Sequence, residues 1–309
     1  LMRILITGGS GTIGKAFIRE FPEHTYYNVS RNEKFLTDLM REHPKTKSYI
    51  GNIEDEGFLM RVFNSVKPDV VIHAAAMKHI NIAEENPIQT CQSNVIGSIN
   101  VINASIMNDV PITIGISTDK ACSSESVYGN TKALMEKCFM EANTTKNRFA
   151  LTRFANVAHS NGSVLPFWLN CKKNNESIKI TDPEMNRLIF SKSDAANLIK
   201  KAIDKCESGD GGFVCSYKMK SVNMMEVAKT IAYEGYVSKI EIVGKRPGEK
   251  VNEDLISQKE TPFTYVHGDM IYIYNQENLD MNTLTEGYSS ENAEKMTEEE
   301  IKDLIWNTK

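Results

Sequence analysis

A cluster of proton-carrying side chains lies near the middle of this 309-residue chain. Asp119 and Lys120 follow the apolar run 110–116, which predicts a buried parallel strand. In the helical pattern that comes next, Tyr128 and Lys132 are four residues apart, a spacing that places a phenol and an ammonium on one helix face. Open α/β sheets bind ligands at the carboxyl ends of their strands. We therefore expect this stretch to be a reaction centre.

Two plainer interpretations compete with a reaction centre. Tyr128 and Lys132 could be an exposed pair on a helix surface, and Asp119 with Lys120 could be an ion pair that caps the loop. A phenol near pKa 10 is a poor base at neutral pH. A nearby ammonium would favour the phenolate, so the pairing of Tyr128 with Lys132 gives this tyrosine a chemical use.

A glycine-rich turn stands near the start of the chain, between the apolar strand pattern 2–7 and the helical pattern 15–21. Gly8, Gly11 and Gly14 are spaced three apart. Their missing side chains allow a tight turn, close approach of a pyrophosphate and close packing of helix on strand, and the helix start supplies free N–H groups for phosphate. The pattern predicts a dinucleotide site formed by Thr7, Gly8, Ser10, Gly11, Thr12, Ile13 and Gly14.

The end of the second predicted strand, 25–29, bears on the choice of cofactor. Ser30 and Arg31 stand there, with Lys34 close behind, where NAD-specific sheets usually place an acidic residue. Because a guanidinium binds phosphate as a planar fork, these residues favour NADP over NAD. A solvated arginine at a helix start is the alternative.

Later strand ends are expected to complete the cofactor site, together with Tyr128 and Lys132. The side chains and backbone expected there belong to Asn52, Ile53, Ala74, Ala75, Ala76, Lys78, Asn94 and Ser117. Lys78 could meet a phosphate or face water. His73 lies in an apolar run and is expected to be a packed histidine with its hydrogen bonds satisfied.

The order of predicted elements indicates the fold class. Strands alternate with helices as far as residue 154, which predicts right-handed βαβ units and an α/β fold with a doubly wound parallel sheet. Beyond 156 the segments become shorter. We expect residues 1–155 to form a dinucleotide-binding Rossmann domain, with 188–220 returning to it. Residues 156–187 and 221–309 would form a smaller substrate domain over the carboxyl edge of the sheet.

Composition narrows the class of partner. The formal net charge of −4 gives no electrostatic reason to expect nucleic acid or an anionic membrane as a partner. The six cysteines form no Cys-x-x-Cys pair, so we expect reduced thiols and no metal site. No apolar run approaches the length of a membrane span. These features predict a soluble, cytoplasmic protein.

Taken together, the motifs resemble those of the extended short-chain dehydrogenase/reductase superfamily, and most closely the bacterial inverting UDP-N-acetylglucosamine 4,6-dehydratases. The resemblance is carried by the three glycines, by Tyr128 with Lys132, and by the runs 75–79, 117–121, 153–157, 180–187 and 246–250. The chain departs from that pattern in two places. The run 122–127 lacks the usual Asn-Pro pair, and Phe154-Ala155 stands where Tyr-Gly is common.

The resemblance implies a division of catalytic roles. Tyr128 would take the proton of the sugar 4-hydroxyl as hydride leaves carbon 4 for the nicotinamide. Lys120, partly neutral, would be the base at carbon 5, and Asp119 would assist departure of the 6-hydroxyl as acid, with Thr118 beside them. Hydride would then return to carbon 6. Because retaining relatives carry Asp-Glu where this chain has Asp119-Lys120, Lys120 points to inversion at carbon 5.

The resemblance also implies a substrate, UDP-N-acetylglucosamine or a close UDP-HexNAc. The expected substrate contacts are Lys78, Lys120, Asn156, Val157, Arg187, Arg246 and Glu249. Arg187 and Arg246 are expected to clamp the diphosphate, although either could be a surface or interdomain residue. A homo-oligomer is implied by resemblance. Two alternatives stay open, a UDP-sugar epimerase or reductase that uses the same tyrosine, and a non-catalytic NADP-sensing protein, which would commonly lose the Tyr/Lys pair.

Overall fold

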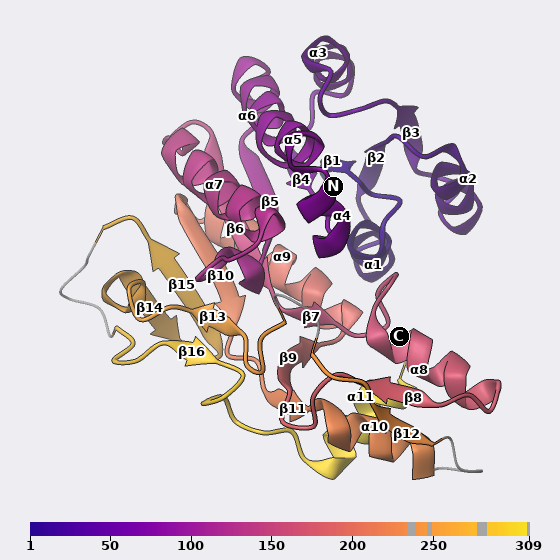
Figure 1. Cartoon of the computed structure of the whole chain (residues 1–309). Coiled ribbons are helices and arrows are strands. Elements are labelled where there is room, and N and C mark those ends of the chain that lie inside the picture. Colours follow the sequence, from indigo (N-terminus) through magenta and orange to yellow (C-terminus); the bar gives the residue numbers. More distant parts are fainter. Residues whose placement is uncertain (234–238, 246–248, 277–282, 308–309) are drawn as a thin grey trace.

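The computed structural model describes residues 1–233, 239–245, 249–276 and 283–307 (Figure 1). Within this part of the chain, the largest element is a nine-stranded sheet. Its strands are, in spatial order, β14 (Thr264–His267), β15 (Met270–Tyr274), β10 (Phe213–Tyr217), β6 (Arg148–Phe154), β5 (Ile112–Thr118), β4 (Val70–His73), β1 (Arg3–Thr7), β2 (Thr25–Ser30) and β3 (Lys47–Ile50).

The strands from β3 to β10 run parallel, as the alternating pattern predicts. The helices that connect or cover them are α1 (Thr12–Glu20), α2 (Glu33–Glu42), α3 (Glu56–Val66), α4 (Ile80–Glu85), α5 (Pro87–Cys91), α6 (Gly97–Met107), α7 (Val127–Ala142) and α9 (Lys192–Glu207). The fold class predicted from the sequence, a doubly wound parallel sheet of Rossmann type, is confirmed.

Strand periodicity explains how this sheet is covered on both faces. In β1, Ile4 and Ile6 join one core cluster with Phe17 of α1, whereas the intervening Leu5 joins a second cluster with Phe63 of α3. Successive side chains of a strand point to opposite faces. Because β1, β2, β4 and β5 run parallel, their carboxyl ends meet at one edge of the sheet.

The helical stretch before β5 contains an irregular turn. A π-turn, η1 (Gln92–Ile96), precedes α6. The turn places Asn94 inward, where it is 1% exposed. Single π-turns within helices are frequent at functional sites.

Smaller sheets and three helices form a second unit on the far side of the carboxyl edge (Figure 1). Its sheets are β11 (Ser221–Asn223)-β9 (Asn186–Phe190)-β7 (Asn156–Val157) and β12 (Ile240–Ile242)-β8 (Ile178–Ile180). Its helices are α8 (Val164–Lys173), α10 (Met224–Tyr233) and α11 (Glu298–Trp306). They share a core of their own, in which Trp168, Ile231 and Ile305 are buried.

The boundary between the two units differs from the expected one. Within the expected returning segment 188–220, β10 pairs with β6, but β9 stays in the second unit. From the expected substrate domain, β14 and β15 extend the main sheet as an antiparallel pair beyond β10. Tyr265, Met270, Ile271 and Ile273 are buried in this pair, whereas His267 is exposed.

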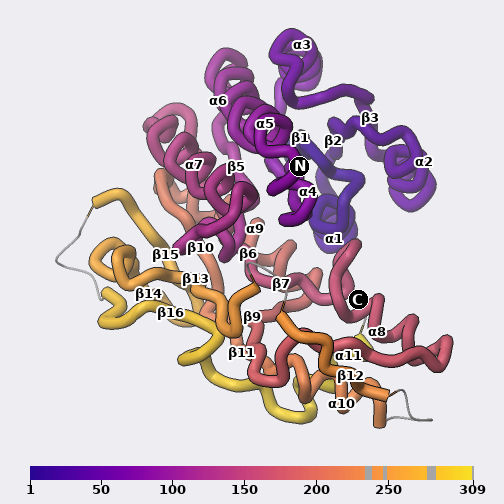
Figure 2. The backbone as a smooth tube through the Cα atoms, in the orientation of Figure 1, coloured from indigo at the N-terminus to yellow at the C-terminus, as the bar shows by residue number. Residues whose placement is uncertain are grey.

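The chain therefore passes several times between the units, as the backbone trace shows (Figure 2). On one of these passages, β13 (Asp254–Ile256) pairs with β16 (Tyr288–Ser289) and packs against the 3₁₀ turn η2 (Asp119–Ala121). None of the helices in the described residues is long and apolar enough to cross a membrane.

Candidate active site

The predicted reaction centre forms where β5 ends. Thr118 is the last residue of β5, and η2 follows at once. A Cβ on Gly129 would lie 2.1 Å from the Lys120 carbonyl oxygen, so only glycine lets the first turn of α7 pack this closely on η2. This close approach brings Tyr128 beside Asp119 and Lys120.

Asp119 and Lys120 form an ion pair at the bottom of the site. The Lys120 Nζ donates to Asp119 Oδ1 at 3.0 Å, and the Thr118 hydroxyl donates to the same oxygen at 2.8 Å. The Asp119 side chain is fully buried, whereas that of Lys120 is 27% exposed. The pair lies on the wall of the cavity described below, where a surface cap would not be expected.

The protonation of Lys120 differs from the expectation that burial or a cationic cofactor would make it partly neutral. Burial would lower the pKa of Lys120, but the charges of Asp119 and Glu253 outweigh it and raise that pKa. Burial raises the pKa of Asp119, and the charge of Glu253 adds to this effect against that of Lys120. In the ligand-free protein, Lys120 is therefore an ammonium.

Tyr128 receives its electrostatic support from an unexpected residue. Burial raises the pKa of Tyr128 to about 12, while the charge of Lys120 and a hydrogen bond with Thr118 act to lower it. The expected partner, Lys132, donates to the sulfur of Met135 at 3.0 Å. Burial lowers the pKa of Lys132 to about 8. The cation that favours the phenolate here is thus Lys120.

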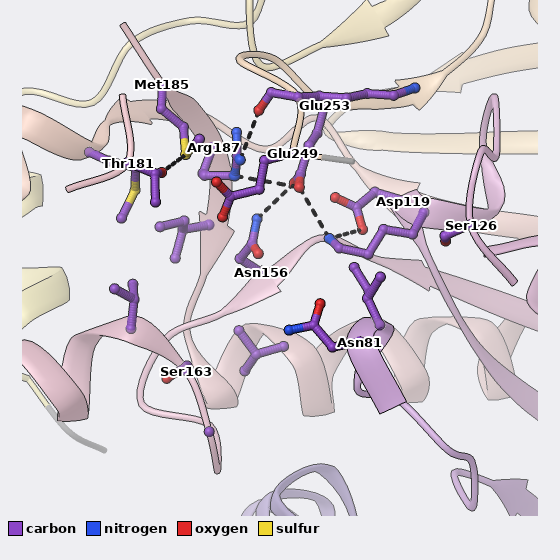
Figure 3. Close-up of a pocket in the computed structure, with 18 of the residues that line it drawn as sticks. Asn81, Asp119, Ser126, Asn156, Ser163, Thr181, Met185, Arg187, Glu249 and Glu253 are labelled. Carbon is purple, nitrogen blue, oxygen red and sulfur yellow. Dashed lines mark hydrogen bonds and ion pairs between the residues drawn. The ribbon is translucent and has the colours of Figure 1, made fainter. Parts of the chain in front are cut away.

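Glu253 was missed by the sequence argument. Its Oε1 lies 3.4 Å from the Nζ of Lys120 and 3.4 Å from the Nε of Arg187, and its Oε2 accepts a hydrogen bond from Asn156 at 3.2 Å. Figure 3 shows Asp119, Asn156 and Arg187 around this carboxylate. The only signal in the sequence was an acidic residue shortly after the cationic run 244–250.

A cavity of about 830 Å³ opens next to these residues, between the sheet edge and the second unit. Of the expected substrate contacts, those that line it are Lys120, Asn156, Val157, Arg187 and Glu249. The Asn156 amide also donates to the Leu188 carbonyl oxygen at 3.0 Å. Arg246 lies outside the described residues. Further lining residues that the sequence argument did not single out include Asn81, Glu84, Trp168 and Met224.

Arg187 is held mainly by backbone carbonyl groups. Its Nη1 donates to Asn186 at 2.8 Å and to Val251 at 3.0 Å, and its Nη2 donates to Lys250 at 2.9 Å. A guanidinium has five N–H donors, and these bonds, with the Glu253 contact, use most of them. The expected bidentate clamp on a diphosphate would require Arg187 to release some of these carbonyls.

The glycine turn has the geometry that a dinucleotide pyrophosphate requires. Gly8 adopts φ +73°, and a Cβ there would lie 2.8 Å from the Ala75 nitrogen. A Cβ on Gly14 would lie 2.4 Å from the Gly9 Cα. These contacts leave no room for side chains, so the backbone at the start of α1 stays open to a ligand. The residues present fit the expected cofactor.

Several expected cofactor residues use their side chains inside the protein. The Thr7 hydroxyl is 2.6 Å from His73 Nδ1, and His73 Nε2 is 2.9 Å from the Ser98 hydroxyl. Burial lowers the pKa of His73 to about 3, which confirms a packed, neutral histidine. Ile53 is 4% exposed and belongs to a core cluster. Any contact of Thr7 or Ile53 with a cofactor would be through the backbone.

The residues around the adenosine end of the expected cofactor are more open. The hydroxyls of Ser10 and Ser30 are 2.8 Å apart, which joins the glycine turn to the end of β2. Arg31 and Lys34 are exposed, as either interpretation of Arg31 allows. The partly exposed residues include Gly11, Thr12, Ile13, Asn52, Ala74, Ala75 and Ala76.

Two further contacts tie the cofactor side to the substrate side. Lys78 Nζ donates to the Asn161 carbonyl oxygen at 2.8 Å, and the Asn161 N–H donates to the Thr12 hydroxyl at 3.1 Å. Asn94 bonds the backbone of Met77 through both its amide oxygen, at 2.8 Å, and its amide nitrogen, at 3.0 Å. Lys78 thus meets a carbonyl group, where phosphate or water was expected.

A buried ionic network underlies the site and was also missed. Arg153 donates to Glu136 Oε2 at 2.6 Å, to Glu260 Oε1 at 2.8 Å and to the Leu255 carbonyl oxygen at 2.8 Å. Ser117, expected at the cofactor, instead donates to Glu136 at 2.6 Å. The network fastens β13 to the main sheet.

A Rossmann sheet with a glycine turn at its first strand and a Tyr–Lys helix at its carboxyl edge defines the extended short-chain dehydrogenase/reductase superfamily. Within it, this chain belongs to the polysaccharide biosynthesis protein family, whose sequence model matches residues 4–275. Both assignments agree with the resemblance seen in the sequence.

Individual relatives fall into more than one activity. The chain is 36% identical to the UDP-N-acetylglucosamine 4,6-dehydratase (inverting) of Campylobacter jejuni, over 85% of this chain and 79% of that protein. It is 31% identical to the UDP-glucose 4-epimerase of Rickettsia canadensis, over 98% and 94% respectively. The crystal structure of Pen from Bacillus thuringiensis matches with a TM-score of 0.89 at 29% identity, covering 100% of this chain and 98% of that one.

Proposed function

We propose that this protein is an inverting UDP-N-acetylglucosamine 4,6-dehydratase, which forms a UDP-4-keto-6-deoxy-hexosamine for polysaccharide synthesis. The observation that carries the proposal is the Asp119–Lys120 ion pair at the cavity wall, beside Tyr128. Tyr128 suffices for sugar oxidation. An adjacent carboxyl and amine add the acid and the base that an elimination of water requires. The Campylobacter relative carries this activity in its name.

The oxidation half depends on Tyr128. The phenolate takes the proton of the substrate 4-hydroxyl, and the positive charge of Lys120 favours that phenolate. A bound NADP supplies reversible hydride acceptance, and the open backbone of the glycine turn would hold its pyrophosphate. The resulting 4-ketone acidifies the proton on carbon 5.

The elimination half depends on a shift of one proton within the Asp119–Lys120 pair. Passage of the Lys120 proton to Asp119 Oδ1, along the 3.0 Å hydrogen bond, produces a neutral amine and a carboxylic acid together. Substrate that displaces water from the cavity favours this neutral pair, because the partly exposed Lys120 ammonium loses solvation. The Lys120 amine then takes the carbon 5 proton, and Asp119 protonates the 6-hydroxyl. The C–H and C–O bonds break, water leaves, and a double bond joins carbons 5 and 6. Return to carbon 6 of the hydride taken from carbon 4, with protonation of carbon 5 from the opposite face, gives the 4-keto-6-deoxy sugar.

The substrate and the reaction are tested together by incubation with UDP-N-acetylglucosamine and NADP in deuterated water. A product lighter by one water, with deuterium at an inverted carbon 5 by NMR, is the expected result. An isomer of unchanged mass would instead support an epimerase, which the Rickettsia relative makes the second candidate. Retention at carbon 5 would contradict inversion, and absence of turnover with any UDP-hexosamine would contradict both enzymes.

The cofactor proposal is NADP, with NAD less favoured, on the basis of Arg31 at the end of β2. Arg31→Ala should lower the preference for NADP over NAD at least tenfold, since a phosphate would lose a bidentate partner. Arg41→Ala removes a similarly exposed guanidinium from the same helix region and should leave the ratio unchanged. Equal ratios in wild type and Arg31→Ala would reject the assignment.

A homo-oligomer is also proposed, through the outer face of α5, α6 and α7. These helices pack on one another, yet Ile88 is 79% exposed, Met107 69% and Leu134 50%. These apolar side chains are spread along neighbouring helices, and exposed apolar surface of this kind is a feature of interfaces. Sedimentation at micromolar concentration should show a multiple of 34.8 kDa, and Ile88→Asp should reduce it. A monomeric wild type would exclude this assembly.

A further inference from the structure

The backbone that carries Glu253 is fixed next to η2 from several sides. The Glu253 N–H donates to the Ser290 hydroxyl at 2.9 Å, and the Ser290 N–H donates to the Glu253 carbonyl oxygen at 2.9 Å. Two residues on, the Leu255 carbonyl oxygen is bound by the buried Arg153. The position of Glu253 is therefore set by the main sheet as well as by its own strand.

The side chain of Glu253 enters the cavity and faces the elimination pair (Figure 3). It is 16% exposed and 3.4 Å from the Nζ of Lys120, while Asn156 and Arg187 hold its two oxygens from the other side. A carboxylate so placed has three partners and still borders the space where a substrate would lie.

Asp119 has one oxygen with no hydrogen-bond partner among the described residues. Its Oδ1 accepts from Thr118 and Lys120, but within the described residues its Oδ2 is buried with no hydrogen-bond partner. An unpaired buried oxygen is unfavourable for an ionised carboxylate. The Asp119 and Glu253 carboxyl groups both contact the Lys120 Nζ, at 3.0 Å and 3.4 Å, so Glu253 is the neighbouring acceptor for a proton on Asp119.

We propose that Glu253 is a positioning residue for the elimination of water: it holds a proton on Asp119 and keeps the Lys120 amine aimed at the cavity. This inference rests on the proposed dehydratase function and adds a third residue to its acid–base pair.

The charges around Asp119 support this arrangement. The titratable groups that act on it are Lys120 and Glu253, with Tyr128 adjacent to Lys120 and Arg187 beyond Glu253. Burial would raise the pKa of Glu253, but Lys120 and Arg187 outweigh burial and lower it, so Glu253 stays ionised. When two close carboxyl groups have pKa values that move in opposite directions, the group with the raised pKa, here Asp119, takes a proton first.

The charge of Glu253 raises the pKa of both members of the pair, Asp119 and Lys120. Its Oε1 also lies 3.4 Å from the Lys120 Nζ. A proton that passes between Lys120 and Asp119 is therefore retained within the pair next to the Glu253 carboxylate.

The first test needs no substrate. Glu253→Gln keeps the shape of the side chain and an oxygen for Asn156 but removes the charge. Carbon-13 NMR of labelled aspartate carboxyls, with Asp119→Asn to assign the signal, should show the Asp119 midpoint falling by about one pH unit or more. Glu125→Gln is the matched control, because Glu125 lines the same cavity but pairs with Lys250 at 3.1 Å.

The second test separates the two halves of the reaction. In Glu253→Gln, water loss should slow at least tenfold, whereas reduction of the cofactor by the 4-hydroxyl should change less than about twofold. Glu253→Asp, which keeps the charge, should restore part of both the titration shift and the water loss. If Glu253→Gln does not fold, the comparison of Glu253→Asp with wild type replaces it in both measurements.

The outcomes distinguish this inference from the proposed function. The role of Glu253 is overturned if the titration midpoint of Asp119 is the same in wild type and Glu253→Gln. It is also overturned if Glu253→Gln slows sugar oxidation and water loss equally. A different result would overturn the proposed dehydratase function alone. In that case the wild type eliminates no water, but the titration midpoint of Asp119 still depends on Glu253.

Discussion

Replacement of Arg153 by Met should destabilise the protein far more than the loss of an ordinary ion pair. The Arg153 side chain is 2% exposed and binds Glu136, which is 7% exposed, and Glu260, which is 26% exposed. Without the guanidinium, two carboxylates would face each other across a buried space, and the Leu255 carbonyl oxygen would lose its donor. Removing one partner from a buried ionic group typically costs about 3–5 kcal/mol.

Urea unfolding, followed by fluorescence, measures this loss. A change of about 3–5 kcal/mol moves the midpoint by about 1 M or more for m-values of about 3 kcal/mol per M. The matched control is Arg3→Met, because Arg3 pairs with Asp69 at 2.9 Å but the two side chains are 45% and 39% exposed. That variant should lose less than about 1 kcal/mol.

Addition of Glu136→Gln to Arg153→Met should recover part of the lost stability, since one of the unpaired charges is removed. Equal losses of stability in Arg153→Met and Arg3→Met would contradict a dominant role for the buried network. A double variant less stable than Arg153→Met alone would show that the buried carboxylate is not the source of the loss.

Three further predictions concern other parts of the molecule. Gly14→Ala should weaken dinucleotide binding at least tenfold by calorimetry, since its Cβ would lie 2.4 Å from the Gly9 backbone. The control is Gly57→Ala, whose Cβ would meet no atom closer than 3.4 Å and which should stabilise α3 by about 0.5–1 kcal/mol. Burial lowers the pKa of His73 to about 3, below the unfolded value of about 6.5. The neutral imidazole therefore contributes its full stability above about pH 6.5, and this contribution is lost as the pH falls from 6.5 toward 3. Urea midpoints measured between pH 7 and pH 4 should fall less steeply in His73→Asn than in wild type. Lys120→Met should raise the pKa of Tyr128, so the pH profile of sugar oxidation in stopped-flow absorbance should move to higher pH, and an unmoved profile would assign the phenolate to another cation.

The sequence was sufficient for the parallel strands of the main sheet and for Asp119, Lys120 and Tyr128 at its carboxyl edge. The continuous apolar runs of β1 and β4 and the glycines at Gly8 and Gly14 act locally, within a strand or a turn. Asp119, Lys120 and Tyr128 were predicted together because the strand and the helix that carry them are adjacent in sequence. Such local rules place side chains without knowledge of the rest of the chain.

The partners supplied by distant segments could not be predicted. Glu253 and Glu260 flank β13 on either side, and no periodicity relates that strand to η2. For the same reason the charged state of Lys120 was unexpected, because the distant Glu253 adds its charge to that of the adjacent Asp119. The pairing of β14 and β15 with β10 was likewise invisible in a pattern that identifies strands but not their neighbours.

The repeated passages between the two units have a consequence for synthesis of the protein. The core of the second unit contains Leu165 and Trp168 of α8, Ile231 of α10, and Ile301 and Ile305 of α11. During translation, the first of these emerge well before the last. The wall of the cavity opposite Asp119 must therefore stay incompletely packed on the ribosome until α11 has been made, although the Rossmann strands β1 to β6 can already pair. A pulse of protease on stalled chains should cut α8 readily before residue 298 and poorly once residue 306 has emerged.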